Sequence, residues 1–372
     1  MKSILVITHC SPHGLPQQGS IIAEGLMRSG LETRVLGKAA SGWGRLLEIL
    51  AYSILLVPRY DVLLVDVFGQ RAFVYESAAI LCARLWKKRI IAVVHNGSMR
   101  EFVERWPRWA RFILAQPTLV LTPSKFLQHQ LLEIGFRVDG IIPNFVNIEN
   151  YPFRERAFLS PKFLFLRGMH SFYNAPMALR AFALIQQKYP NASLTMAGKE
   201  DEDSDYCRSL VQSLNLRNVR FLGIVPKEKI PALAAEHDIH LHTNRVDNMP
   251  ITIIEMWASG LPIVGTNVGG VPYLIRDRQD GILVKSEDYE AMADACFELL
   301  CNSQLANTLS RNGRARAEEL TWERVRAIWK AALELDDDVA LGIISNDRTV
   351  QWPPRVTLTE VKGGKSGGES QQ

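Results

Sequence analysis

The sequence predicts an α/β protein of two domains, each built on a parallel β-sheet. Three observations support this fold class. The chain has 372 residues, which is more than one hydrophobic core usually encloses, and 47% of them are hydrophobic. In residues 1–150, short apolar runs alternate with helix-forming segments, as in repeated β-α-β units. Between residues 247 and 284, a loop, a helix, an apolar strand and a glycine turn follow closely, as at the ligand-binding edge of such a sheet.

Residues 1–150 are expected to repeat the order strand, loop, helix. The predicted strands cover residues 2–8, 33–36, 61–67, 89–94 and 119–122, and the first predicted helix covers residues 20–29. Gly14 and Gly19 precede this helix and let the backbone pass close to a ligand, while the helix start points free amide groups outward. No G-x-G-x-x-G fingerprint follows a predicted strand, so a nicotinamide cofactor has little support.

His95 directly follows the predicted strand at residues 89–94 and precedes the loop Asn96-Gly97-Ser98. Ligands of open α/β sheets gather at the carboxyl ends of the strands, so His95 is a candidate functional residue. A histidine that only forms hydrogen bonds within its loop would explain the same position.

Two apolar segments of the first half are candidates for contact with a membrane surface. Residues 46–57 are too few to span a bilayer and include Glu48, and they also fit a packed helix. Residues 102–114 mix aromatic side chains with arginines, as interfacial segments do, although core packing explains the aromatic residues equally well. Residues 1–150 hold 17 Lys and Arg against 11 Asp and Glu. This excess suits an anionic partner or surface, or simply a basic solvated face.

The cysteines and the amino terminus indicate a reducing compartment. No C-x-x-C pair occurs among the five cysteines, which argues for reduced thiols and against a zinc site. These are Cys10, Cys82, Cys207, Cys296 and Cys301. The first ten residues lack the long apolar core of a signal peptide and fit a first strand better. We therefore expect a cytoplasmic protein, with a peripheral position at the inner face of a membrane left open, and no nucleic-acid partner.

The second half is expected to form another α/β unit that ends in a long helix. The predicted strands cover residues 162–166, 193–197, 219–223 and 261–264, and the predicted helices cover residues 175–189, 289–302, 304–320 and 322–335. Residues 336–372 lose this periodicity and end in a polar, glycine-rich stretch, which predicts a disordered tail.

Asp247 and Glu255 bracket the start of a helix predicted near Ile251. Pro250 suits the beginning of a helix because its missing N–H would have no helical partner there. Free amides at a helix start bind anions or polarised hydroxyls, and carboxylates accept hydrogen bonds from the paired hydroxyls of a sugar. The residues that offer such amides are Met249, Ile251 and Thr252. The segment therefore fits a sugar and phosphate site, although Asp247 as a helix cap and Glu255 as a solvated side chain would also fit.

The spacing of these two acids resembles the acidic-x7-Glu motif of retaining glycosyltransferases with the GT-B fold, in particular glycosyltransferase family 4, the group 1 glycosyl transferases. The similarity continues through EMWASGLPIVGTNVGGVPYLI and DGILV. It implies two Rossmann-like lobes whose parallel sheets face each other across a cleft. Residues 1–150 would bind the acceptor and residues 151–335 the nucleotide-sugar donor, because IIPNFVNIENYPF is similar to the interdomain linker of the family. The last helix is expected to cross back to the first lobe.

The resemblance implies roles for residues of the acidic motif. Glu255 would bind the hydroxyls of the nucleotide ribose, and Asp247 with the loop behind it would contact the transferred sugar. This loop comprises Asn248, Met249, Pro250, Ile251 and Thr252. The first acid of the family is more often Glu, so the shorter Asp247 leaves the identity of the sugar open.

The resemblance also implies roles outside the motif. His95 would touch the donor sugar near the reacting carbon, and Gly19 would face the donor phosphate. Gly223 and Val225 would be neighbours of the nucleotide base. Arg167 would hold the donor diphosphate. The lysine that accompanies this arginine in the common family pattern is missing, and Tyr173 and Asn174 stand in its place, so Asn174 would take part in donor binding.

The implied function is retaining transfer of a sugar, of the hexosyl type, from a nucleotide-diphosphate sugar to a glycan or lipid-linked acceptor in cell-surface polysaccharide or glycoconjugate synthesis. No cofactor or metal is expected. The run Asp201-Glu202-Asp203 superficially fits the metal-binding D-x-D motif of the GT-A fold, but such loops are usually solvated. Two alternatives of the same fold stay open. One is a non-catalytic protein that binds a nucleotide sugar or glycan, and the other is a nucleotide-sugar epimerase or phosphorylase.

Overall fold

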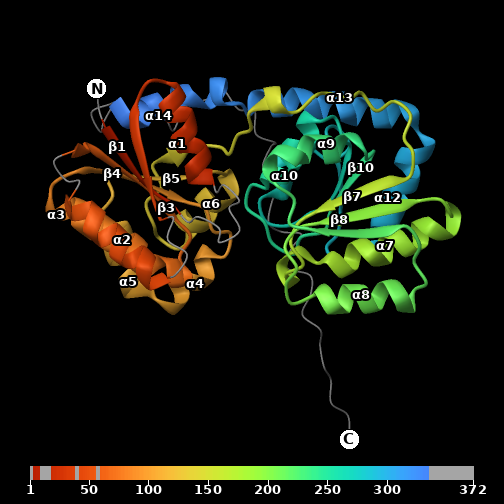
Figure 1. The fold of residues 1–372 in the computed structure, drawn as a ribbon, viewed down its shortest axis with the longest axis horizontal. Coiled ribbons are helices and arrows are strands. Elements are labelled where there is room, and N and C mark those ends of the chain that lie inside the picture. The colour runs from red at the N-terminus through yellow and green to blue at the C-terminus, as the bar shows by residue number, and fades with distance from the viewer. Residues whose placement is uncertain (1–2, 9–17, 38–41, 56–58, 335–372) are drawn as a thin grey trace, which may run out of the picture.

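The computed structural model describes residues 3–8, 18–37, 42–55 and 59–334 and contains two parallel six-stranded sheets in two lobes (Figure 1). The strand order is β2-β1-β3-β4-β5-β6 in the first sheet and β12-β11-β10-β7-β8-β9 in the second. The predicted α/β fold class is thereby confirmed. Cys10, Gly14 and the tail predicted at residues 336–372 lie outside the described residues.

The first lobe holds strands and helices in alternation. Its strands are β1 (Ser3–Ile7), β2 (Glu32–Leu36), β3 (Val62–Val67), β4 (Arg89–Val94), β5 (Leu119–Thr122) and β6 (Gly140–Ile141). Its helices are α1 (Gln18–Arg28), α2 (Gly42–Leu55), α3 (Phe73–Leu85), α4 (Met99–Arg105), α5 (Pro107–Leu114) and α6 (Lys125–Glu133). Every residue of β3 is buried, because helices cover both faces of a parallel sheet.

The apolar segment at residues 102–114 forms parts of two helices rather than one. Helix α4 ends before Trp106, which has an extended φ of −129°, and Pro107 begins α5. Proline has no amide hydrogen to donate, so it starts a new helix here instead of continuing the old one. Among the described helices, none has both the length and the apolar character needed to cross a membrane.

The second lobe begins between β6 and β7, an interval that includes residue 150. Its strands are β7 (Lys162–Leu166), β8 (Ser193–Ala197), β9 (Val219–Gly223), β10 (Ile239–His242), β11 (Ile263–Thr266) and β12 (Ile282–Val284). Its helices are α7 (Ala175–Lys188), α8 (Ser204–Ser213), α9 (Ile230–Ala235), α10 (Ile251–Ala258), α11 (Val271–Leu274), α12 (Tyr289–Cys301) and α13 (Ser303–Glu319). Strand β11 starts two residues later than predicted, because the Leu261 amide still donates to the Met256 carbonyl at the end of α10.

Helix α14 (Trp322–Glu334) returns to the first lobe and packs beside α1 (Figure 1). Its apolar side chains share one core with β1 and α1. This core includes Ile4, Val6, Ile22, Leu26, Trp322, Val325, Ile328 and Trp329. A Cβ atom at Gly25 would lie only 2.6 Å from the Trp322 ring, so the absence of a side chain there allows α1 and α14 to pack closely.

The chain passes between the lobes twice, and the two crossings lie side by side. The Val146 amide donates to the Leu320 carbonyl at 3.0 Å, and Val146 forms an isolated parallel bridge with Thr321. The linker after β6 and the segment before α14 therefore form one joint between the lobes.

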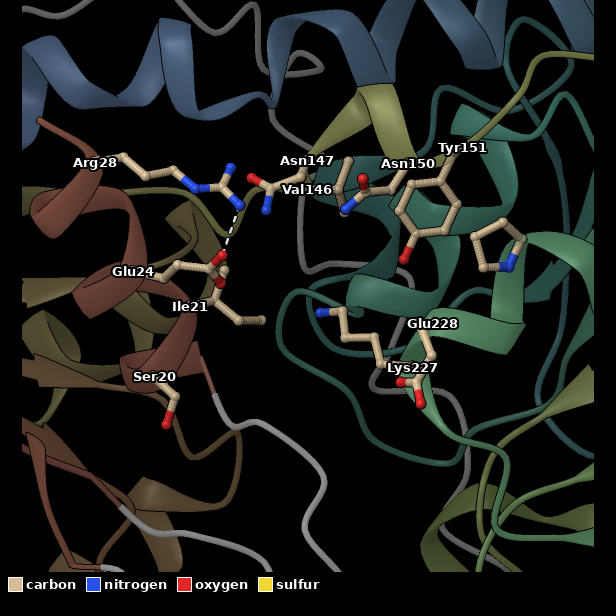
Figure 2. Close-up of a pocket in the computed structure, with 11 residues that line it drawn as sticks. Ser20, Ile21, Glu24, Arg28, Val146, Asn147, Asn150, Tyr151, Lys227 and Glu228 are labelled. Atoms are coloured by element: carbon tan, nitrogen blue, oxygen red, sulfur yellow. Dashed lines mark hydrogen bonds and ion pairs between the residues drawn. The ribbon is translucent and has the colours of Figure 1, made fainter.

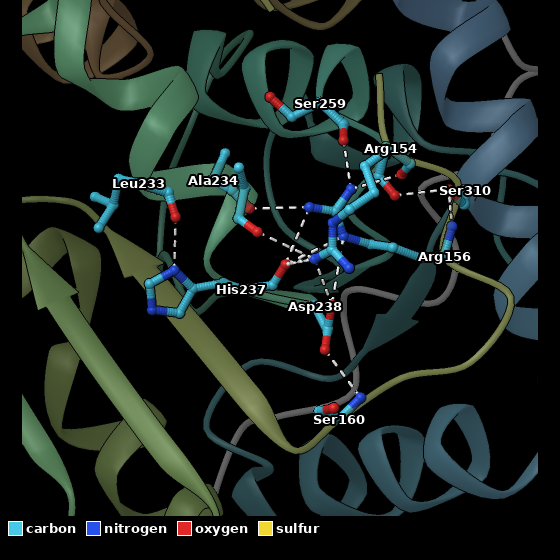
Figure 3. A network of polar contacts seen from close by, with 11 residues as sticks. Arg154, Arg156, Ser160, Leu233, Ala234, His237, Asp238, Ser259 and Ser310 are labelled. Atoms are coloured by element: carbon cyan, nitrogen blue, oxygen red, sulfur yellow. Dashed lines mark hydrogen bonds and ion pairs between the residues drawn. The ribbon is translucent and has the colours of Figure 1, made fainter. Parts of the chain in front are cut away.

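A buried arginine holds helices α9 and α10 together at their carboxyl ends. Arg156 is fully buried and donates to the backbone carbonyls of Ala234 at 2.9 Å, His237 at 3.1 Å and Ser259. Figure 3 shows its guanidinium among these carbonyls, which lie at the carboxyl ends of α9 and α10. Burial lowers the pKa of Arg156 to about 9. Because helix ends leave carbonyls unpaired, one cationic fork satisfies both ends and holds the two helices together.

Candidate functional site

Loops from both sheets meet at the carboxyl ends of their strands, and Asn248 connects the two lobes there. Its side-chain amide donates to the His95 carbonyl at 3.0 Å, and its side-chain oxygen accepts a hydrogen bond from Ser124. One residue further, the Met249 carbonyl accepts from the Asn144 side chain at 2.8 Å. The loop after β10 is thereby held against the first lobe, as expected for a site at facing strand ends.

Asp247 is held in place by three hydrogen bonds to its carboxylate, and the one from Arg167 is also an ion pair. Its Oδ2 atom accepts from Arg167 Nη2 at 2.6 Å and from Asn244 Nδ2 at 2.6 Å, and its Oδ1 accepts from the Asn248 amide at 2.8 Å. The residue at the amino-terminal end of α10 is Pro250, and no side chain caps this helix. The interpretation of Asp247 as a mere helix cap is therefore wrong. The two side chains predicted to bind the sugar and the diphosphate neutralise each other here.

The predicted glycine turn lies against the loop at residues 247–250, which we call the acidic loop. The Gly270 amide donates to the Asp247 carbonyl at 2.9 Å. Added Cβ atoms would lie 1.6 Å from the Asn248 carbonyl oxygen at Gly270 and 2.2 Å from the Asp247 carbonyl oxygen at Gly269, which has a φ of 53°. Only glycine permits this approach of two backbones, so the sharp turn predicted at these residues is confirmed.

Glu255 is buried rather than solvated, with only 3% of its surface exposed. Its Oε1 accepts a hydrogen bond from the Tyr151 hydroxyl at 2.7 Å and lies 3.7 Å from Lys227 Nζ. Burial raises the pKa of Glu255, while the nearby charges of Lys227 and Arg167 oppose this rise. The interpretation as a solvated side chain is thus wrong. A carboxylate between a hydroxyl and two cations is suited to binding further hydroxyls.

Lys227 and Tyr151 are site residues that sequence reasoning missed. Lys227 lies on the short 3-10 helix Lys227–Lys229 after β9, and Tyr151 lies in the linker between the lobes. Both also line a cavity of about 480 Å³ together with Ser20, Arg28 and Asn147. Figure 2 shows Arg28 and Ser20 on the first-lobe side of this cavity and Lys227 and Tyr151 on the other. Two cations after a Val-Pro pair, in VPKEK, were the available signal for Lys227.

Tyr173 and Asn174 do not replace the missing lysine with a charge. Asn174 is fully buried, donates to Glu287 at 3.0 Å and accepts from Arg245 at 3.1 Å. The Tyr173 ring instead lies 5.2 Å from the Arg167 guanidinium, in a cation–π contact. This segment therefore positions Arg167, and a role of Asn174 in donor binding stays a prediction.

His95 is oriented by a buried acid. Its Nε2 lies 3.0 Å from Asp66 Oδ1, and the other oxygen of Asp66 accepts from the Thr8 hydroxyl at 2.7 Å. The Phe68 ring stacks on the imidazole with a centroid separation of 5.3 Å. This arrangement fixes the ring orientation, as in other histidine–carboxylate pairs. Asp66 was missed, although it is the one charged residue in the buried strand β3.

Gly19 lies against the same acid. A Cβ atom there would be 2.1 Å from Asp66 Oδ2 and 2.6 Å from the Thr8 hydroxyl, so α1 can begin at this point only with glycine. The start of α1 thus lies beside the carboxylate that holds His95. The predicted contact of Gly19 with a phosphate stays a prediction.

Two buried histidines of β10 lie beneath the acidic loop. Burial lowers the pKa of His240 to about 3 and places the pKa of His242 well below its usual value, so both are neutral. His242 Nε2 lies 3.6 Å from Asp247 Oδ2. Sequence reasoning did not single out this pair, although both residues interrupt an otherwise apolar strand.

The remaining predicted residues lie on the second lobe. Gly223 ends β9 with a φ of 63°, and its carbonyl accepts from the Gly198 amide at 2.8 Å. Val225 packs at the edge of the core beneath α10. Their contact with a base stays a prediction, as do the individual roles of His95, Arg167 and residues 247–255.

The acidic run at residues 201–203 is tied to its neighbours. Asp201 accepts from Lys199 at 3.1 Å, and Glu202 accepts from the Ser171 amide at 2.8 Å. In the part of the chain that the structure describes, no three or more His, Cys, Asp or Glu side chains are grouped to hold a metal ion. The absence of a metal requirement stays a prediction.

Comparison with known proteins finds sequence relatives of the second lobe. Residues 151–316 match the family model of the glycosyl transferases group 1. N-acetyl-alpha-D-glucosaminyl L-malate synthase of Bacillus anthracis is 30% identical over 152 residues, which cover 40% of this chain and 37% of that protein. The amylovoran biosynthesis glycosyltransferase AmsK of Erwinia amylovora is 24% identical over 221 residues, covering 56% of this chain and 54% of its own. The first three curated relatives are matched over only 37–44% of their length.

Solved structures match both lobes. Anabaena Alr3699/HepE, in complex with UDP and glucose, superposes with a TM-score of 0.73 at 17% identity and covers 90% of this chain and 100% of its own. Sucrose-phosphate synthase from Thermosynechococcus elongatus has a TM-score of 0.71 at 16% identity, covering 88% and 97%. The two described lobes therefore have the GT-B fold of these structures, and residues 151–316 match the glycosyl transferases group 1.

Proposed function

We propose that this protein is a retaining glycosyltransferase that moves a sugar, of the hexosyl type, from a nucleotide-diphosphate sugar to a glycan or lipid-linked acceptor. Cell-surface polysaccharide or glycoconjugate synthesis is the process it would serve. One observation carries the proposal: Arg167, Asp247 and Glu255 come together between the lobes, with His95 held against the same loop. The two matched relatives named for sugar transfer support the same reaction class.

The donor would bind along the second lobe. Glu255 has a buried carboxylate that can accept the ribose hydroxyls, and Lys227 and Arg167 supply positive charge for the diphosphate. Lys227 thus offers the second cation that residues 173–174 lack. HepE, whose structure contains UDP, makes UDP the first nucleotide to test.

The chemical step would proceed on one face of the sugar. The bond between the anomeric carbon and the diphosphate oxygen breaks, the acceptor oxygen bonds to the same face, and the acceptor proton passes to the departing phosphate. Arg167 and the free amides of Ile251 and Thr252 would stabilise the charge that builds on the diphosphate. Asp247, released from Arg167 by the incoming diphosphate, would accept hydrogen bonds from the sugar, and His95 would contact the sugar near the reacting carbon.

No metal or other cofactor has a part in this scheme, because the cationic side chains take the place of a metal ion. Transfer in the presence of EDTA is therefore expected to equal transfer without it. Loss of activity in EDTA that manganese restores would contradict this expectation.

A peripheral position on the cytoplasmic face of a membrane would bring the protein to a lipid-linked acceptor. On α2, Trp43 and Leu47 expose 79% and 65% of their surfaces, which suits contact with an interfacial layer. Co-sedimentation with anionic liposomes at low salt is expected, and replacement of both residues by serine should abolish it. No sedimentation of the unchanged protein would contradict this position.

A thermal-shift panel tests the donor site. UDP, GDP, ADP and their sugars are added to the protein and to two variants, Glu255→Ala and the exposed control Glu290→Ala. At least one nucleotide diphosphate is expected to raise the Tm of the protein and of the control, because a bound ligand stabilises the folded state by mass action. The same nucleotide should leave Glu255→Ala unchanged. No shift with any nucleotide would contradict the proposal.

Nucleotide release distinguishes the alternatives of the same fold. A transferase releases nucleotide diphosphate faster when acceptor is present, an epimerase turns over the donor without acceptor, and a phosphorylase needs inorganic phosphate. A binding protein shows a thermal shift without release, an outcome that the missing lysine at residues 173–174 would then explain. Retention is read from the anomeric configuration of the first product formed.

A further inference from the structure

We propose that a cavity on the first lobe is the subsite for a hexuronic-acid residue of the acceptor, an inference that rests on the proposed transferase function. The cavity has a volume of about 600 Å³ and lies between the start of α3 and helices α4 and α5. Its lining includes Gln70, Arg71, Ser98, Arg105, Trp106 and Trp109. None of these residues belongs to the donor site described above.

The cavity is joined to the loop of His95 by short, direct connections. Ser98, in its wall, follows His95 by three residues, which span at most about 11 Å of extended chain. The Asn96 side chain donates to the Phe68 carbonyl at 2.7 Å, and the Phe68 ring stacks on His95. A sugar in the cavity would therefore lie within a few sugar units of the reacting centre.

A second loop, at residues 68–70 after β3, also lies between His95 and the cavity and has an unusual backbone conformation. Gly69 and Gln70 both have positive φ angles, of 70° and 52°. The buried carboxyl of Glu76 accepts from the Phe68 amide at 3.0 Å and from the Gly69 amide at 3.3 Å. A left-handed Gln70 is unfavourable on its own, and such conformations persist where the surroundings hold them, often at ligand sites.

The side chains of the cavity favour an anionic occupant. Among the described residues, Arg71 and Arg105 have no carboxylate partner, whereas Arg100 on the same surface pairs with Glu104 and Glu133. Unpaired guanidinium groups bind carboxylates through two parallel hydrogen bonds. Glu101, the one acid of the lining, leaves a net positive charge there.

Two further features favour a sugar over a lipid surface. Trp106 is 50% exposed and lies edge-to-face with Trp109 at a centroid separation of 6.4 Å. The Arg105 guanidinium lies over this ring, 6.0 Å from its centroid, so the indole and the cation could together contact one side of an acidic sugar ring. Gln70, Ser98 and Glu101 supply hydrogen-bond partners for hydroxyls inside a concave site. A flat lipid headgroup layer would use the cations but has no ring hydroxyls for these polar groups.

Calorimetric titration of the full chain tests the proposal with two matched oligosaccharides. One is a tetrasaccharide that contains glucuronic acid, and the other is its carboxyl-reduced, neutral counterpart. The protein is compared with the cavity variant Arg71→Gln/Arg105→Gln and with the control Arg84→Gln/Arg108→Gln. Both double variants lose two exposed charges on the same lobe, but the control residues lie outside the cavity. UDP is titrated into all three proteins as a separate measure of the donor site.

The acidic tetrasaccharide is expected to bind the protein and the control equally and the cavity variant at least about tenfold more weakly, because each arginine contributes a charged hydrogen bond. The neutral tetrasaccharide should bind the unchanged protein at least about tenfold more weakly than the acidic one. A Trp106→Ala variant should weaken both ligands, and UDP affinity should be the same throughout.

Three results would overturn the inference. These are equal weakening in the cavity and control variants, equal affinity for the acidic and neutral sugars, and no binding of either sugar. If the cavity variant instead loses only its binding to phosphatidylglycerol vesicles, the cavity is a lipid contact. If none of the nucleotides of the thermal-shift panel binds, while the sugar results are as expected, the proposed transferase function is contradicted and the sugar site still stands.

Discussion

The ion pair between Arg167 and Asp247 occupies the place where the donor is expected to bind. The two charges neutralise each other at 2.6 Å, with 20% and 14% of their side-chain surfaces exposed. A diphosphate can replace Asp247 as the partner of Arg167, because phosphate oxygens form the same paired hydrogen bonds with a guanidinium. The carboxylate released in this way becomes free to bind the sugar, so donor binding and sugar recognition are linked through one side chain.

The variant Asp247→Asn tests nucleotide binding and sugar recognition separately. Without its acidic partner, Arg167 is expected to bind UDP at least as tightly as before, whereas kcat falls by about 100-fold or more because the sugar loses a negatively charged acceptor and meets an amide donor in its place. Calorimetry with UDP and a transfer assay measure the two effects. A parallel loss of UDP affinity would show that Asp247 supports the nucleotide directly.

Glu76 makes the stability of the first lobe depend on pH. Burial raises the pKa of this carboxyl to about 8 from its usual 4.5, although two backbone amides oppose the shift. The folded protein therefore retains a proton that the unfolded chain releases. The stability from Glu76 is complete below about pH 4.5 and is lost as the pH rises through about 8.

Glu76→Gln is expected to remove this dependence, because glutamine does not ionise. Urea denaturation of both proteins between pH 5 and pH 8 measures it. Relative to the variant, the free energy of unfolding of the unchanged protein should fall by on the order of 1 kcal/mol per pH unit. Parallel curves for the two proteins would contradict the assignment to Glu76.

At the scale of elements, the turn after β11 determines where the acidic loop lies. Gly270→Ala would place a Cβ atom 1.6 Å from the Asn248 carbonyl oxygen, so the loop must move. We expect a loss of about 1–3 kcal/mol in the free energy of unfolding, as for other overpacked sites, together with weaker donor binding. Gly265→Ala is the control, since its Cβ atom would make only ordinary contacts at 3.6 Å or more. Similar losses in both variants would contradict the argument.

Elements with local signals were predicted well, and contacts between distant elements were not. Pro250 and the Gly269-Gly270 pair marked the start of α10 and the turn after β11, because both depend on backbone restrictions of single residues. Tyr151 meets Glu255 across 104 positions of sequence, and no local pattern announces such a contact. The same holds for the buried Arg156, whose partners are backbone carbonyls that carry no sequence signal.

The two lobes as a whole followed from the alternation of strands and helices. Their facing arrangement was expected only from the family resemblance, because it depends on a few hydrogen bonds such as those of Asn248 with Ser124 and His95. These hydrogen bonds join the acidic loop to the His95 segment, and the sequence had indicated the two as independent candidates. The predicted site residues could thus be singled out one by one, whereas the contacts of Asp66 with His95 and of Lys227 with Glu255 became visible only in the assembled molecule.

The return of α14 makes the first lobe depend on the end of the described chain. Trp322 is 8% exposed and lies 5.2 Å from Phe145 by ring centroids. Trp322→Ala is expected to lower the free energy of unfolding by about 3–5 kcal/mol. Thermal or urea unfolding measures it, with Trp43→Ala on the exposed face of α2 as the control that should change little. Equal effects would mean that α14 does not stabilise the lobe.

The joined crossings at Val146 and Thr321 also limit how the molecule can move. A single connecting strand would allow the lobes to turn about several axes, but two strands held together resist torsion. Opening and closing of the lobes is then expected to be easier than twisting, as in hinge-bending proteins. Each closure would return His95 and Asp247 to the same relative position. The geometry of this pair would then be the same in each catalytic cycle.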